Sequence, residues 1–167
     1  MYWDMSLLKR IVKVLLVISL FIFFIPVTKE VTIKNRTQSV IKSNNIDSEY
    51  SGFIYIPKFE YKNLIKEGND SLEKNLVLLT DFSNKIGEDK IILAGHNNKY
   101  VFSKIYNLFV GDEIVISDFM IDYNYKVKER KIIKVDDFSF FNEDGLYLIT
   151  CTSNNQERFV IKAKREY

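Results

Sequence analysis

Cysteine, histidine, proline and glycine are all scarce in this chain. Its 167 residues include one cysteine, one histidine, two prolines and six glycines. A single cysteine excludes a disulfide within the chain, and one cysteine with one histidine is too few for a structural zinc site of the Cys/His type. A lone cysteine is most often a small apolar residue of the core, so Cys151 alone does not predict catalysis.

The sequence also lacks a strong charge of either sign. Lysine and arginine number 24 against 22 aspartate and glutamate, for a net charge of +2. No basic block with interleaved aromatic residues is present, which argues against a nucleic-acid partner. Aromatic residues are abundant instead, with 13 Phe and 10 Tyr beside many Ile and Val, and this composition favours a β-rich fold.

The N-terminal region has the pattern of an exported protein. Lys9, Arg10 and Lys13 precede an uncharged apolar run, and residues 7–27 are together long enough to span a membrane. No small-residue cleavage site follows the run. We therefore expect residues 1–27 to contain an uncleaved signal-anchor helix. It crosses the plasma membrane once, with the N-terminus in the cytoplasm and the rest of the chain outside.

The remainder divides into a polar linker over residues 28–50 and a domain over residues 51–167. Alternating and continuous apolar runs in this domain predict about seven or eight strands and one or two short helices. This count favours a mainly β fold, a small closed barrel or a sandwich. The expected elements are strands at 53–56, 90–94 and 113–117, a long strand or hairpin over 121–136, a final hairpin, and helices beginning near Ser71 and Val101.

The final hairpin contains the cysteine. Two apolar runs, 146–151 and 158–163, flank a short polar break. If Asn154 and Asn155 form a two-residue turn, Cys151 faces Arg158 across the two strands. A permanent cation beside a thiol favours the thiolate, which is the nucleophilic form of cysteine.

Three side chains are candidates for chemistry. His96 follows the buried strand at 90–94, Cys151 ends a strand, and Arg158 lies at the start of the next. A histidine moves protons near neutral pH, a thiolate attacks a carbonyl carbon, and an arginine stabilises the resulting oxyanion. Together they suffice for acyl transfer through a thioester, without a cofactor or a metal ion.

Several segments in this order resemble the sortases, the membrane-anchored cysteine transpeptidases of Gram-positive bacteria. They are Ile56-Pro57-Lys58, Ile92-Leu93-Ala94-Gly95-His96-Asn97, Phe102-Ser103-Lys104-Ile105-Tyr106, Gly111-Asp112-Glu113-Ile114, Leu148-Ile149-Thr150-Cys151-Thr152 and Arg158-Phe159-Val160-Ile161-Lys162-Ala163. The resemblance implies a closed eight-stranded β-barrel of the sortase type.

The resemblance also implies an activity. Cys151 would attack the Thr–Gly bond of a Leu-Pro-x-Thr-Gly-like sorting signal on a surface protein. His96 would exchange protons with the leaving and incoming amines, and Arg158 would hold the substrate and the oxyanion. Thr150 would contact the substrate. The acyl group would pass to an amine of cell-wall peptide or of a pilin-like protein.

Some features depart from the family pattern, and other readings stay open. Tyr147 stands where the family often has threonine, and the short segment 136–145 argues against a class B sortase with its large helical insertion. The only prolines, Pro26 and Pro57, leave no Asp-Pro-aromatic lid. One alternative is a cysteine acyl transferase like the L,D-transpeptidases, although their Ser-x-Gly-Cys motif is absent. The other is a membrane-anchored β-domain that binds a surface partner without catalysis.

Overall fold

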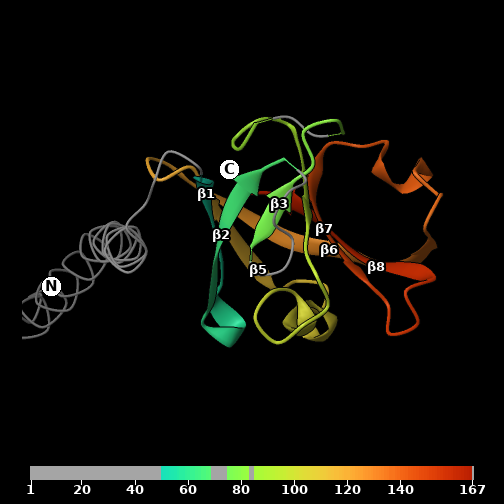
Figure 1. Ribbon diagram of the computed structural model, residues 1–167. Coiled ribbons are helices and arrows are strands. Elements are labelled where there is room, and N and C mark those ends of the chain that lie inside the picture. The colour runs from blue at the N-terminus through green and yellow to red at the C-terminus, as the bar shows by residue number, and fades with distance from the viewer. Residues whose placement is uncertain (1–49, 69–74, 83–84, 167) are drawn as a thin grey trace, which may run out of the picture. The chain divides into compact units, whose positions relative to one another are not determined.

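The computed structural model describes residues 50–68, 75–82 and 85–166, and its eight strands close into a barrel (Figure 1). Around the barrel the order is β1-β2-β3-β4-β7-β8-β6-β5. The predicted mainly β, closed eight-stranded fold is therefore confirmed. The strands are β1 (Tyr50–Ile56), β2 (Tyr61–Glu67), β3 (Leu76–Leu78), β4 (Lys90–Ala94), β5 (Glu113–Ser117), β6 (Asp122–Lys134), β7 (Gly145–Cys151) and β8 (Glu157–Arg165).

Helical structure in the described ranges is limited to three short 3-10 segments, one more than the most that the sequence predicted. They are η1 (Pro57–Phe59), η2 (Ser103–Asn107) and η3 (Ser139–Phe141). The helix expected from Ser71 begins outside the described residues, and at its far end Leu76–Leu78 forms β3 instead. There the chain pairs with β2 on one side and β4 on the other, so tertiary pairing overrides the local pattern.

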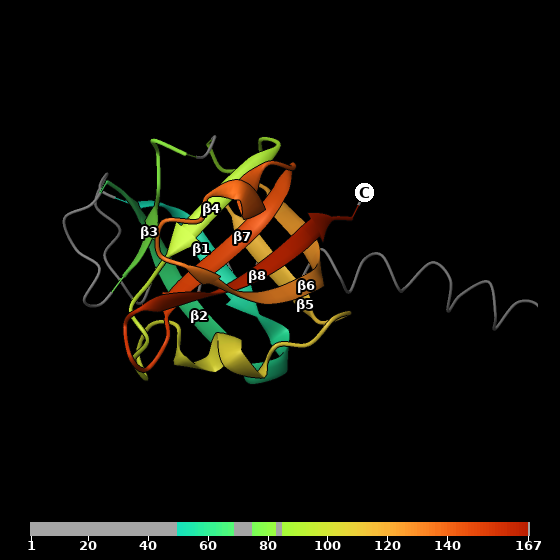
Figure 2. The same ribbon diagram turned by 90° about the vertical axis from the view of Figure 1, so that its right-hand side faces the viewer.

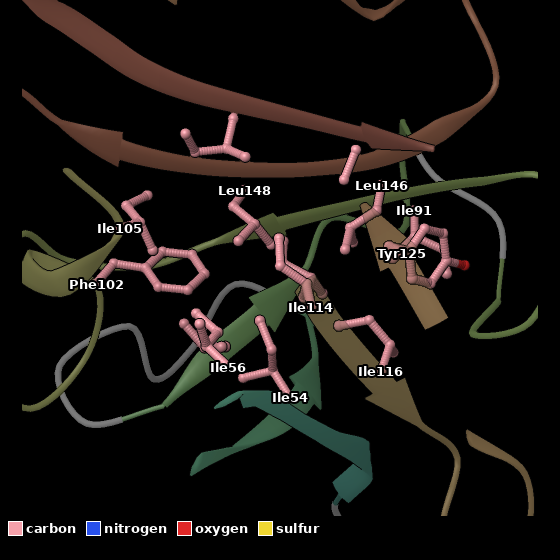
Figure 3. Close-up of a cluster of buried hydrophobic side chains, with 14 of the residues drawn as sticks. Ile54, Ile56, Ile91, Phe102, Ile105, Ile114, Ile116, Tyr125, Leu146 and Leu148 are labelled. Atoms are coloured by element: carbon pink, nitrogen blue, oxygen red, sulfur yellow. The ribbon is translucent and has the colours of Figure 1, made fainter. Parts of the chain in front are cut away.

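The interior of the barrel is filled by large aliphatic and aromatic side chains from every strand (Figure 3). Ile54, Ile114 and Leu148 are fully buried there. Phe102 and Ile105, at and within η2, add to the same cluster. Burial of each such side chain contributes about 1.5–3 kcal/mol to the stability of the fold. The packed barrel is therefore a rigid support for the residues at its strand ends.

A second apolar cluster lies on the outer face of β4, β7 and β8, which run side by side in Figure 2. Its buried members are Ile92, Ile133, Tyr147 and Val160, and the partly buried Leu79, Phe140, Phe141 and Ile149 pack against them. The Tyr147 ring meets both phenylalanine rings of η3 edge to face, with centroids 6.0 and 5.2 Å away. Strand β7 is consequently buried on both of its faces.

The segment that joins β6 to β7 contains η3 as its one regular element. This agrees with the short connection expected from the sequence, with no large helical insertion between these strands.

The predicted membrane-anchor helix at residues 7–27 and almost all of the linker at residues 28–50 lie outside the described residues. In the ranges that the structure does describe, no helix has the length and apolar character needed to cross a membrane.

Candidate active site

Cys151 is the last residue of β7 and lies directly opposite Arg158 in β8. Opposed residues of an antiparallel pair place their side chains on the same face of the sheet. This is the outer face, because the alternate residues Tyr147 and Ile149 belong to the outer cluster. The thiol is free and half-buried. The predicted facing of Cys151 and Arg158 is confirmed.

The turn that creates this register differs from the one predicted. The N–H of Asn155 donates to the carbonyl of Thr152 at 3.0 Å, so Ser153 and Asn154 are the central residues of the turn. Asn155 takes the left-handed conformation with φ 59°, which asparagine tolerates. The Asn154 side chain accepts bonds from the Thr152 hydroxyl and the Gln156 N–H. The four-residue loop has the same centre as the predicted turn, so the strand register is unchanged.

The guanidinium group of Arg158 is anchored by the backbone of its own hairpin. Its Nη1 donates to the carbonyl of Asn155 at 3.3 Å and to that of Glu157 at 3.2 Å. Both bonds hold the long side chain beside the loop that follows Cys151. The cation therefore stays near the end of β7, and within the described residues it forms no ion pair with an acidic side chain.

His96 reaches this region because β4 runs parallel to β7, with Ala94 paired to Ile149. Two hydrogen bonds extend the contact past the last paired residue. The Gly95 N–H donates to the Ile149 carbonyl at 3.1 Å, and the Thr150 hydroxyl donates to the Gly95 carbonyl at 2.8 Å. His96 therefore leaves β4 at the level where Cys151 ends β7, and its side chain is exposed.

Gly95 shows why the residue before His96 has no side chain. A Cβ atom there would lie 2.6 Å from Val101 Cγ1, 2.7 Å from Leu76 and 2.9 Å from Phe102. These neighbours are buried core residues that have no room to retreat. Only glycine lets the loop that carries His96 fold tightly over the end of the barrel.

Thr150 occupies a structural position. Its side chain is 2 % exposed, and its hydroxyl is used by the bond to the Gly95 carbonyl. It points to the opposite face of β7 from Cys151, as alternation along a strand requires. Contact between Thr150 and a substrate stays a prediction.

Tyr106 is part of the site although sequence reasoning gave it no role. Its hydroxyl donates to the Cys151 carbonyl at 2.8 Å, and its ring stacks on Phe159 at 4.4 Å. Burial, and next the electrostatic interaction with Cys151, raise the pKa of the Tyr106 hydroxyl. The apolar spacing of η2 identifies Ile105 as a core residue but contains no signal for the tyrosine that follows it.

Arg130 of β6 holds the short helix η2, which contains Tyr106, in place. Arg130 Nη2 donates to the Tyr106 carbonyl at 2.9 Å, and the same guanidinium lies 4.6 Å from the centre of the Phe109 ring. On the neighbouring helix η1, Lys58 forms an ion pair with Asp112, and the distance from Nζ to Oδ2 is 2.7 Å. Burial is the largest single influence on Asp112 and raises its pKa, but the hydrogen bonds from Lys58 and the Phe109 N–H, together with the charges of Lys58 and Arg130, outweigh burial and lower the pKa of this carboxyl. These contacts fix the position of the hydroxyl behind Cys151.

Within residues 50–68, 75–82 and 85–166, no three His, Cys, Asp or Glu side chains gather closely enough to hold a metal ion.

Comparisons with known proteins agree with this arrangement. Residues 54–166 match the family model of the Sortase domain. The candidate sortase YwpE of Bacillus subtilis (strain 168) is 35 % identical over 88 residues, which cover 48 % of this chain and 86 % of that protein.

Solved structures show the same fold. Sortase C1 from Streptococcus agalactiae is 29 % identical with a TM-score of 0.67, over 73 % of this chain and 70 % of that one. Sortase C from Clostridium perfringens SM101 is 25 % identical with a TM-score of 0.65, over 73 % and 72 %. Because the family model matches well over half of the sequence, this chain belongs to the sortase family.

Proposed function

We propose that this protein is a cysteine transpeptidase that cleaves a Leu-Pro-x-Thr-Gly-like sorting signal between Thr and Gly. The observation that carries the proposal is the opposed pair of Cys151 and Arg158 at the end of β7 and β8. The loop bearing His96 is hydrogen-bonded to the same strand end. Membership of the sortase family supports the same reaction class.

In the first half of the reaction, the Cys151 thiolate attacks the carbonyl carbon of the substrate threonine. The carbonyl oxygen becomes an oxyanion, which the Arg158 guanidinium stabilises. The C–N bond to glycine then breaks, and protonated His96 gives its proton to the leaving amine. A thioester between the threonine and Cys151 remains.

In the second half, a primary amine attacks the thioester carbon. Neutral His96 takes a proton from the attacking nitrogen, the C–S bond breaks, and the thiolate of Cys151 is restored. The acceptor is the amine of a cell-wall peptide or of a pilin-like protein. With water in its place, the same step gives hydrolysis.

The outer face of β7 suggests where the signal lies. Ile149 is two residues from Cys151 on the same face and is only half-buried. It offers apolar surface to the Leu-Pro part of the signal, and the η3 phenylalanines close that surface at its far side. Residues 7–27 cross the plasma membrane in this proposal and leave the barrel outside the cell, where sorting-signal-bearing surface proteins arrive.

The decisive experiment incubates the full-length chain in detergent with a panel of sorting-signal peptides and a primary amine. We expect cleavage after threonine, a transfer product and a thioester adduct at Cys151, all detected by mass spectrometry. If none of the three forms across the panel, the enzyme proposal fails in favour of a membrane-anchored binding domain. Cleavage only of substrates in which the carbonyl of an L-residue is bonded to a D-amino-acid leaving group would favour an L,D-transpeptidase-like reaction.

A further inference from the structure

The loop between β5 and β6 has an exposed apolar tip. This β5–β6 tip consists of residues 118–121, and its Met120 and Ile121 side chains are 88 % and 54 % exposed. Hairpin loops usually contain asparagine, aspartate or glycine at such positions, because these residues adopt turn conformations most easily. Among the described residues, no other large apolar side chain is as exposed as Met120. An apolar tip of this kind indicates a contact surface.

The amide groups of the β5–β6 tip are hydrogen-bonded within the tip itself. The Phe119 N–H donates to the Ser117 hydroxyl at 3.2 Å. The Asp118 carboxylate accepts from the N–H groups of Met120 and Ile121, at 2.9 and 2.7 Å. Leaving a backbone N–H without a partner in an apolar medium is costly. Because these three N–H groups already have partners, the tip can enter an apolar medium without that cost.

The β5–β6 tip lies at the end of the barrel where β1 begins. Strand β5 is antiparallel to β1, with Ser117 opposite Phe53, so the residues after Ser117 continue toward the level of Tyr50 (Figure 1). The ring of Phe119 contacts that of Phe53, with centroids 6.0 Å apart. This contact holds the tip beside the strand through which the chain enters the barrel.

Two residues at the start of β1 and the end of β2 are of types that favour a membrane interface. Tyr50 lies opposite Lys66 in the sheet, and the lysine Nζ is 5.0 Å from the centre of the tyrosine ring. Tyrosine and lysine suit the level of the lipid headgroups, because each combines an apolar body with a polar end. The pair and the β5–β6 tip share one end of the barrel.

The candidate active site is at the other end. Strand β5 runs in the opposite direction to β7, as the pairings through β6 and β8 show. The tip that follows β5 is therefore at the end where β7 begins, at Gly145, and Cys151 is at the far end of that strand. A strand of this length extends about 20 Å. A surface that contacts the tip leaves Cys151 uncovered.

The proposed membrane anchor keeps a lipid surface within reach of the tip. Residues 28–49 join the proposed anchor to Tyr50, and a segment of this length spans at most about 75 Å in any conformation. Tethering of this kind raises the local concentration of the barrel at the membrane. A small apolar contact is then enough to hold the barrel in one orientation.

We propose that the β5–β6 tip inserts into the outer leaflet of the membrane that holds the anchor. Met120 and Ile121 enter the boundary between the headgroups and the acyl chains, and Tyr50 and Lys66 lie at the level of the headgroups. This inference rests on the membrane anchor of the proposed function. The contact orients the barrel so that the candidate active site points away from the bilayer.

The first test places a single tryptophan at the tip. The sequence has one tryptophan, Trp3. Full-length Trp3→Phe/Met120→Trp is reconstituted in vesicles of phosphatidylcholine and phosphatidylglycerol, with and without lipid brominated in the upper acyl chain. Bromine quenches tryptophan on contact. A tip inserted about 5–10 Å deep reaches it, so we expect blue-shifted emission and a loss of intensity with brominated lipid. No quenching at position 120 overturns the proposal.

The matched control is Trp3→Phe/Val110→Trp. Val110 is also an exposed apolar residue, but it precedes β5 and so lies at the other end of the barrel. Its emission should not change with brominated lipid. Equal quenching of the two reporters overturns the proposal, because it means that the membrane contacts the barrel without a preferred orientation.

A second variant tests the apolar character of the tip. Ile121→Asp is added to the reporter at position 120, and the new charge should remove most of the quenching, because a charge is costly to bury in a bilayer. Unchanged quenching overturns the proposal. So does a blue shift that grows with protein density but not with brominated lipid, which indicates contact between copies of the chain.

Flotation of the vesicles separates this inference from the proposals on which it rests. A chain that does not float with the vesicles has no membrane anchor, and the tip contact is then refuted with it. A chain that floats with an unquenched tip refutes the tip contact alone. Peptide cleavage is measured separately, so its absence refutes the proposed reaction and does not alter the quenching result.

Discussion

The Tyr106 hydroxyl donates a 2.8 Å hydrogen bond to the carbonyl of Cys151 and so joins η2 to the end of β7. It is the one side-chain bond to the backbone of the candidate nucleophile within the described residues. We expect Tyr106→Phe to keep the fold, since the ring still stacks on Phe159. The lost bond should cost about 0.5–1.5 kcal/mol of stability. Transfer should fall several-fold through kcat, as measured by peptide turnover.

A matched variant tests that reading of Tyr106. Tyr100 has an exposed ring outside the candidate site, so Tyr100→Phe should leave turnover unchanged. Equal loss in both variants would mean that the Tyr106 hydroxyl has no special role in positioning Cys151.

Cys151→Ala should abolish cleavage and transfer. The side chain is small, half-buried and not in a disulfide, so its removal should leave the barrel intact. Circular dichroism and the melting temperature should match the wild type within a few degrees, while mass spectrometry detects no thioester adduct. Residual turnover above one part in a thousand would remove Cys151 from the role of nucleophile.

Arg158→Lys should be severely impaired although the charge is kept. One guanidinium nitrogen, Nη1, donates to both hairpin carbonyls, and the planar group has further N–H donors that a lysine ammonium does not present in the same geometry. Loss of an oxyanion donor typically costs about 10²- to 10³-fold in kcat. Steady-state kinetics on a cleavable peptide measures the effect. Near-normal kcat would show that Arg158 is outside the site, whatever happens to KM.

Thr150→Val should destabilise the protein more than Thr150→Ser does. The buried hydroxyl donates to the Gly95 carbonyl, and valine leaves that acceptor unsatisfied at a cost of about 1–3 kcal/mol. Serine keeps the bond and loses only a methyl group. Urea unfolding compares the two variants, and equal free energies of unfolding would show that the bond does not secure the loop of His96.

Glu143 should contribute to stability in a pH-dependent way. Hydrogen bonds from Lys162 and Lys164, at 3.0 and 3.3 Å, lower the pKa of Glu143. A carboxyl whose folded pKa is below its unfolded value stabilises the fold at higher pH. That contribution is lost as the pH falls from the pKa of the unfolded state, about 4.3, through the lower pKa of the folded state. Glu143→Gln should therefore be less stable than wild type at pH 7 and equal to it at pH 2.5.

Urea unfolding at both pH values provides the measurement. Glu113→Gln serves as the control, because Glu113 is exposed at the start of β5 and its pair in the sheet is Lys126 at a different site. If the free energy of unfolding of Glu143→Gln is lower than that of wild type by the same amount at both pH values, the electrostatic explanation is contradicted.

The final hairpin could be predicted from the sequence because its information is local. Two apolar runs around a polar break fix the register of Cys151 and Arg158, even though the turn itself is centred on Ser153 and Asn154. The long strand β6 could also be predicted, because Tyr123, Tyr125 and Val127 alternate with polar residues and the apolar pattern resumes at Ile132. Local counting needs no knowledge of the rest of the chain.

Other parts of the fold depend on distant partners. Leu76–Leu78 is a strand only because β2 and β4 pair with it, and β2 itself has an irregular pattern interrupted by Lys62 and Asn63. The approach of His96 to Cys151 requires the parallel pairing of β4 with β7, about 55 residues apart. Neither spacing nor propensity encodes that pairing, and only the resemblance to a family predicted that His96 and Cys151 act in one site.

Closure of the barrel also determines how a peptide can be recognised. Every strand has a neighbour on both sides, so no strand offers an extended peptide a free edge along its whole length. Backbone pairing with a strand edge, which reads no sequence, is thus limited to the short stretches where a neighbouring strand has ended. Discrimination among ligands must depend on side chains at the strand ends and in the loops. A change of specificity therefore requires only substitutions there, and the barrel can stay as it is.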